Sequence, residues 1–104
     1  MKDHMKTRVP TYRIADGILC QELDRESVVL NLGTEQYFSL DPVGTRIWKL
    51  LAETRSIDAT VRTMLSEYEI DEAALRQDVE ELVRKLIAKG LLIEDAGTGN
   101  DAAA

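Results

Sequence analysis

The amino-acid sequence predicts an α+β fold, in which a small antiparallel sheet is followed by a cluster of helices. Three observations lead to this prediction. Before Asp41 the patterned segments are short and favour strands, and after it the apolar residues recur at helical spacing. Between the two regions, Asp41 is a typical N-cap residue and Pro42 occupies the first helical position. Residues 36–48 therefore join a strand directly to a helix.

Length and composition predict a single domain. The chain has 104 residues, and those from 17 to 93 show a regular pattern, which is enough for one modest hydrophobic core. Residues 1–16 are expected to form a flexible N-terminal arm, although residues 9–14 have an extended character that could cover a sheet edge. Residues 94–104 are small and polar, so a disordered C-terminal tail is expected there.

Several classes of protein are disfavoured by composition. No apolar run approaches the roughly 20 residues needed to span a membrane, and the start of the chain lacks the apolar core of a signal peptide, so a cytoplasmic protein is expected. With one cysteine, Cys20, and one histidine, His4, we expect no disulfide, no metal site and no cofactor. Cys20 is expected to be a buried or half-buried strand residue. A net charge of −6 disfavours nucleic acid as a partner.

The strands are predicted as a three-stranded antiparallel meander. Its segments are residues 18–23, 27–32 and 36–40, with turns at 24–26 and 33–35. The second strand lies in the middle, so the first and third are edges. The third strand contains no Lys or Pro to block further pairing, which predicts an edge left open for use. An open edge can also pair with itself, so a homodimer through this strand is one expected alternative.

The helices are predicted at residues 42–52, 57–68 and 72–89. Asp41, Ser56 and Asp71 are suited to cap their N-termini, and Gly90 is suited to end the third helix in the left-handed conformation. Residues 91–93 should then fold back on the core as a short extended segment. Trp48 is expected to anchor the core between sheet and helices, with a pocket wall as the alternative.

Two long stretches of the sequence resemble a known family. Residues 30–51 read LNLGTEQYFSLDPVGTRIWKLL, and residues 65–92 read LSEYEIDEAALRQDVEELVRKLIAKGLL. Both are similar to the PqqD-like family, the small recognition domains of ribosomally made and modified peptides. The resemblance covers about residues 17–92. The positions that carry it are Leu30, Asn31, Leu32, Tyr37, Leu40, the spacing from Gly44 to Trp48, Asp78, Val79, Gly90, Leu91 and Leu92. Family members often have Thr-Gly at the second turn, where this chain has Gly33-Thr34-Glu35.

The resemblance implies a winged-helix-like domain that binds the leader segment of a precursor peptide without catalysis. The partners that it implies are that leader and a modifying enzyme such as a leader peptidase, and among such systems lasso-peptide biosynthesis is the one we prefer. A leader that is disordered when free must recover its ordering cost through backbone hydrogen bonds and a few apolar anchors. An open strand edge beside a helix supplies both.

The expected peptide-binding residues come from the third strand and the third helix. They are Gln36, Tyr37, Phe38, Ser39 and Leu40 on the strand, and Arg76, Val79, Leu82 and Val83 on the helix. Alternative interpretations remain for three of them. Val79 and Leu82 have the spacing of ordinary core residues, and Arg76 could be a solvated helix charge.

Two other functions fit the sequence less well. A winged-helix DNA-binding regulator would need a basic recognition helix, but the third helix with its cap has five acidic and four basic residues, a net charge of −1. An enzyme would need an acid, base or nucleophile in a constellation that one His and one Cys do not provide. We therefore expect no catalysis, and DNA binding is the alternative function.

Overall fold

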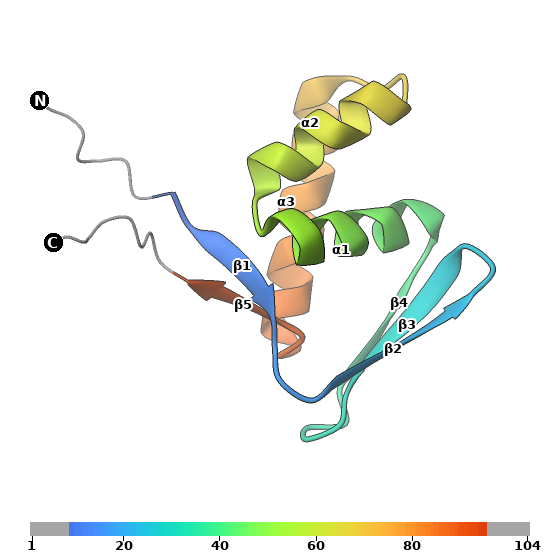
Figure 1. The fold of residues 1–104 in the computed structure, drawn as a ribbon, viewed down its shortest axis with the longest axis vertical. Helices are drawn as coiled ribbons and strands as arrows, with labels where there is room; N and C mark the ends of the chain where they lie inside the picture. The colour runs from blue at the N-terminus through green and yellow to red at the C-terminus, as the bar shows by residue number, and fades with distance from the viewer. Residues whose placement is uncertain (1–8, 96–104) are drawn as a thin grey trace, which may run out of the picture.

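The computed structural model describes residues 9–95 and has the predicted α+β architecture (Figure 1). In chain order its elements are β1 (Thr11–Ile14), β2 (Ile18–Leu23), β3 (Glu26–Asn31), β4 (Tyr37–Leu40), α1 (Pro42–Thr54), α2 (Ile57–Glu67), α3 (Glu72–Ala88) and β5 (Leu92–Asp95). The three predicted strands and three predicted helices are all present, with ends that differ by at most two residues. None of the helices within residues 9–95 is long and apolar enough to cross a membrane.

The strands form two separate antiparallel sheets. In the larger sheet the order is β2-β3-β4, so β3 is central and the predicted meander is confirmed. The β2–β3 turn is only two residues long, and Asp24 takes the left-handed conformation there, with φ of 62°. The smaller sheet pairs β1 with β5, which brings Thr11 opposite Asp95 and Ile14 opposite Leu92 (Figure 1).

The smaller sheet corrects the predicted arm and tail. Residues 1–16 were predicted to be a flexible arm, but β1 lies within them, and the Tyr12 side chain is buried in the core. The Tyr12 N–H donates to the Arg55 carbonyl at 3.1 Å, which ties β1 to the end of α1. The predicted tail is also wrong at Glu94 and Asp95, which belong to β5. The remainder of both segments, residues 1–8 and 96–104, including His4, lies outside the described residues.

The helices begin and end where their capping residues predict. Side-chain oxygens of Asp41, Ser56 and Asp71 accept hydrogen bonds from backbone N–H groups in the first turns of α1, α2 and α3. After α3, Gly90 has φ of 73°, and the Leu91 N–H donates back to the Leu86 carbonyl at 2.9 Å. This is the glycine-terminated geometry that turns the chain sharply into β5.

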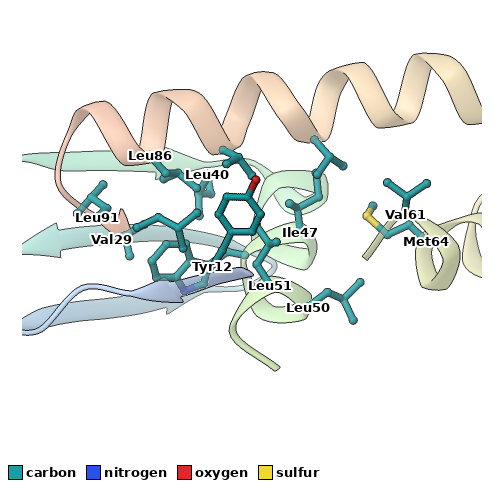
Figure 2. Packing of buried hydrophobic residues seen from close by; sticks show 14 of the residues in the cluster. Tyr12, Val29, Leu40, Ile47, Leu50, Leu51, Val61, Met64, Leu86 and Leu91 are labelled. Carbon is teal, nitrogen blue, oxygen red and sulfur yellow. The ribbon is translucent and has the colours of Figure 1, made fainter. Parts of the chain in front are cut away.

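The hydrophobic core lies between the larger sheet and the helices. Figure 2 shows Tyr12, Val29 and Leu86 gathered where strands and α3 approach one another, with α1 contributing Ile47 and Leu51. Trp48 is 4% exposed, so its predicted role as a core anchor is confirmed. Val61 and Met64 of α2 extend the same core toward the far end of α3.

The face of β3 that contacts the core differs from the one suggested by its apolar residues. Val28, Leu30 and Leu32 alternate along the sequence, yet Val28 and Leu32 are exposed. The buried set has the opposite parity: Ser27, Val29 and Asn31. The two polar side chains tolerate burial because they are hydrogen-bonded, for example Ser27 Oγ to Thr45 Oγ1 at 2.8 Å.

Cys20 was predicted to be buried or half-buried, and this prediction is wrong because Cys20 is exposed. It pairs with Val29 across the sheet and so shares the inner face. The packing of α1, however, is on β3 and β4, and at β2 the helix contributes an ion pair between Lys49 and Glu22. The inner face of β2 is therefore covered incompletely.

We expect Trp48→Ala to lower the free energy of unfolding by about 3 to 5 kcal/mol, since it removes a large buried side chain. Such a loss is comparable with the whole stability of many small domains. Urea denaturation followed by circular dichroism measures it. Leu23→Ala is the matched control, because Leu23 is exposed on β2 and its truncation should cost less than about 0.5 kcal/mol. Equal stabilities for the two variants would contradict the core assignment.

Candidate functional site

A groove of about 370 Å³ lies between β4 and α3. One wall is β4 and the other is the middle of α3, and the first turns of α1 close its base. The lining residues are Phe38, Ser39, Leu40, Asp41, Val43, Gly44, Ile47, Asp78, Glu81, Leu82 and Lys85. The apolar lining residues come from all three elements. The charged lining residues are Asp41 at the base and Asp78, Glu81 and Lys85 on α3.

Within residues 9–95, no strand pairs with β4 along the side away from β3. β4 is the last strand of its sheet, and the Asn31 N–H donates to the Gln36 carbonyl at 2.8 Å. In an antiparallel pair the hydrogen-bonded positions alternate, so Phe38 and Leu40 direct their N–H and C=O groups toward β3, as the Gln36 carbonyl does. The Gln36 N–H instead donates to Thr34 Oγ1 at 3.3 Å. Tyr37 and Ser39 direct theirs outward. The edge thus offers two donors and two acceptors to a further strand.

The side chains of β4 divide between the two faces of the sheet. Phe38 and Leu40 lie on the inner face, opposite Val29 and Ser27, and Leu40 is buried while Phe38 is partly exposed toward the groove. Tyr37 is on the outer face and is 59% exposed. An extended chain that paired with β4 would therefore place alternate side chains in the groove and on the outer face.

The helical wall combines one apolar residue with a surplus of negative charge. Asp78, Leu82 and Lys85 are spaced by four and three residues, so they lie on one face of α3, and Glu81 flanks them. With Asp41 at the base, three carboxylates face one ammonium group. The Asp41 carboxylate also caps α1, since its Oδ1 accepts from the Gly44 N–H at 2.7 Å.

Gly44 allows α1 to begin close to the sheet. A Cβ atom at this position would lie 3.2 Å from both Leu40 Cδ2 and Asp41 Oδ1. These distances are tighter than ordinary contacts, so a side chain at this position would force the helix away from the sheet. The partner in that approach is Leu40 of β4, and the consequence is a compact base for the groove.

The predicted site residues are brought together only in part. Phe38, Ser39, Leu40 and Leu82 line the groove, and Gln36 and Tyr37 lie along the same strand segment just beyond it. Val79 and Val83 are 0% and 3% exposed, and they form the core behind the helical wall.

Arg76 lies apart from the groove. Its Nη1 pairs with Asp58 Oδ1 of α2 at 2.7 Å, and it lines a second hollow of about 190 Å³ beside Tyr12 and Ile57. The contact with Asp58 raises the pKa of the Arg76 guanidinium further above its usual range.

The sequence prediction missed the charged residues of the helical wall and the contribution of α1. Asp78 and Lys85 are four residues before and three residues after Leu82, so helical periodicity identifies them once Leu82 is placed in the groove. Glu81 then follows from its spacing of three and four residues to those two. Val43 and Ile47 are four residues apart and fit the apolar stripe of a helix. Nothing in their spacing distinguishes a groove base from the core.

Comparison with known proteins places this groove in context. The family model described as Coenzyme PQQ synthesis protein D (PqqD) matches residues 26–92. The solved structure of TbiB1 in complex with the TbiA(beta) leader peptide is similar with a TM-score of 0.72 and 38% identity, covering 77% of this chain and 93% of that chain. Lasso peptide synthetase B1 complexed with the leader peptide also gives a TM-score of 0.72, at 23% identity, covering 80% and 98%. No curated protein sequence matched.

Proposed function

This chain belongs to the PqqD family, and we propose that it binds the leader segment of a ribosomally synthesised precursor peptide without catalysing a reaction on it. The observation that carries the proposal is the groove between β4 and α3, with its unpaired strand edge. TbiB1, a protein of 38% identity, was solved with a leader peptide bound. The lasso-peptide class of precursor is part of the proposal, because the other similar structure is a lasso peptide synthetase B1 complexed with the leader peptide.

Strand addition to β4 is the mode of binding that we propose. A peptide that is disordered when free loses conformational entropy on binding, and repeated backbone hydrogen bonds offset that loss. The outward groups of Tyr37 and Ser39 would supply these bonds. One parity of peptide side chains would then enter the groove against Phe38, Leu40 and Leu82, which would hold an apolar anchor.

The charge of the groove favours a particular kind of leader. Asp78 and Glu81 outweigh Lys85 on the helical wall, so a leader with Lys or Arg next to its apolar anchor would be attracted. The same negative charge opposes contact with nucleic-acid phosphates. We therefore propose a leader that combines an apolar or aromatic anchor with a basic neighbour.

Delivery to a modifying enzyme, such as a leader peptidase, completes the proposal. A domain that holds the leader raises the local concentration of the attached substrate near an enzyme that binds it.

Cys20 is poorly suited to serve as a nucleophile in this chain. Desolvation by its surroundings, followed by the negative charge of Glu22, raises the pKa of its thiol, so less of the reactive thiolate is present at neutral pH.

The first expectation is that the protein binds the leader and ignores the core peptide that follows it. Separate titrations of fluorescently labelled leader and core peptides test this. Leader binding should saturate, and core peptide should show no saturable binding at the same concentrations. Tight binding of the core peptide alone would contradict the proposal.

Sedimentation analysis with and without leader would also test the predicted homodimer, because a dimer through β4 should dissociate when the leader occupies that edge.

Proline substitutions test strand addition at single-residue resolution. Ser39→Pro removes an outward N–H and adds a ring at the edge, so leader affinity should fall more than tenfold while circular dichroism stays that of a folded protein. Tyr37→Pro should behave alike. Phe38→Pro removes a bond to β3 and should unfold or strongly destabilise the sheet. Ser39→Ala is the matched control, because it keeps the N–H group. If folded Ser39→Pro binds leader as well as wild type, the peptide does not use this edge.

Charge substitutions test the proposed leader preference. Asp78→Asn combined with Glu81→Gln should weaken binding of a leader with a basic residue by about three- to tenfold at low salt, and the difference should shrink as salt is added. Glu53→Gln is the control, since Glu53 is exposed on α1 outside the groove lining. A leader whose basic residues are replaced by Gln should bind the double variant and wild type equally. Unchanged affinity of the double variant for the basic leader would refute the preference.

A further inference from the structure

The Asn31 side chain joins the turn that precedes β4 to the residue that terminates α3. Asn31 ends β3 and is 8% exposed. Its Oδ1 accepts hydrogen bonds from the Gly33 N–H at 2.9 Å and the Thr34 N–H at 3.1 Å. Its Nδ2 donates to the Gly90 carbonyl at 2.8 Å. Both polar ends of the carboxamide are therefore hydrogen-bonded, the oxygen to the turn before β4 and the nitrogen to the end of α3.

The oxygen end fixes the turn that leads into β4. Gly33 and Thr34 are the middle of that turn, and the Asn31 backbone reinforces it, because its carbonyl accepts from the Glu35 N–H at 2.7 Å. Glu35 has φ of 64°, a conformation that a residue other than glycine adopts at a cost. The Asn31 hydrogen bonds hold the turn in this shape and so determine where β4 begins.

The nitrogen end fixes the end of α3. Gly90 is the left-handed residue that terminates this helix, and its carbonyl is the acceptor for Asn31. Within residues 9–95, no other side-chain hydrogen bond joins the segment from β3 to β4 with the segment from α3 to β5. One side chain thus links the turn before one wall to the end of the other wall.

We propose that Asn31 is a positioning residue for leader binding: it sets the separation of β4 and α3 without contacting the peptide. This inference rests on the proposed function. A peptide that must pair with β4 and at the same time pack against α3 binds best when the two walls are already held at the required distance. If the link is lost, part of the free energy of binding is used to order the groove. Affinity then falls even though no peptide contact is removed.

Asn31→Asp tests the two ends of the side chain separately, because a carboxylate has nearly the same shape as the carboxamide that it replaces. At neutral pH it still accepts from Gly33 and Thr34, but it has no proton to donate to the Gly90 carbonyl. The turn is kept and the connection to α3 is lost. We expect leader affinity, measured by fluorescence titration, to fall about tenfold relative to wild type.

The same variant contains its own rescue. As the pH falls through the pKa of the introduced carboxyl, ordinarily about 3.9, the group gains an O–H that can donate to the Gly90 carbonyl. The ratio of wild-type to variant affinity, measured at each pH from 7 to about 4, should therefore return toward one. Asn31→Ala lacks both ends, so its deficit should stay constant over the same range. Circular dichroism confirms folding at every pH.

Val61→Ala serves as the stability control, because Val61 is buried in α2 away from the groove. It should lower the melting temperature and leave leader affinity unchanged under folded conditions. Wild-type affinity for Asn31→Asp at neutral pH would overturn the proposal, as would a deficit that acid does not relieve. Failure of wild type itself to bind leader would instead refute the proposed function. If both Asn31 variants unfold, exchange of the wild-type Asn31 side-chain amide protons decides: leader binding should slow it, and unchanged exchange would overturn the proposal.

Discussion

The corner between β4 and α1 is the constraint on which the remaining structure depends. Asp41 directly follows the last residue of β4 and caps α1 with its side chain, and its carbonyl accepts from the Thr45 N–H at 2.8 Å. No loop separates the two elements, because α1 begins at the residue after the cap, so the angle between β4 and α1 is fixed at one residue. The direction of α1 is therefore set by the direction of β4. The core, the base of the groove and the open edge all follow from that one junction.

Buried polar side chains stabilise the sheet in places where apolar side chains were expected. Ser27 bonds to Thr45 across the sheet–helix interface, and Asn31 bonds to the turn and to the end of α3. Buried hydrogen bonds contribute modest net stability, but a displaced arrangement would leave these groups unsatisfied at a larger cost. Such pairs select one register of β3 against its neighbours. An apolar face at these positions would tolerate sliding more easily.

The sequence was sufficient for the elements but not for all of their surroundings. Caps and periodicity are local signals, and they located α1, α2, α3 and the meander closely. The pairing of β1 with β5 joins segments some 80 residues apart and depends on Tyr12 filling a site on the core, which no local pattern reveals. The exposure of Cys20 and the inward parity of β3 depend on how far α1 extends over the sheet, which is a tertiary property.

The candidate site divides in the same way. The strand wall was predictable, because an unblocked edge can be recognised from residue types in residues 36–40. For the helical wall, the prediction included Val79 and Val83, which are buried in the core, and left out Asp78 and Glu81, which line the groove. The two valines are apolar and regularly spaced, whereas the two acidic residues resemble ordinary solvated charges. Family resemblance names the helix that takes part. The rotation of that helix about its axis decides which residues face the groove, and it is set by packing.

The β1–β5 pair has a consequence for how this domain can be joined to others. Its register places Thr11 beside Asp95, so the chain enters and leaves the described domain at neighbouring points (Figure 1). A unit with adjacent ends can be inserted into a surface loop of a larger protein, or fused at either end, with little strain on either partner. The larger sheet and its groove are formed by residues 18–88, away from this entry point. The architecture is thus that of a portable module.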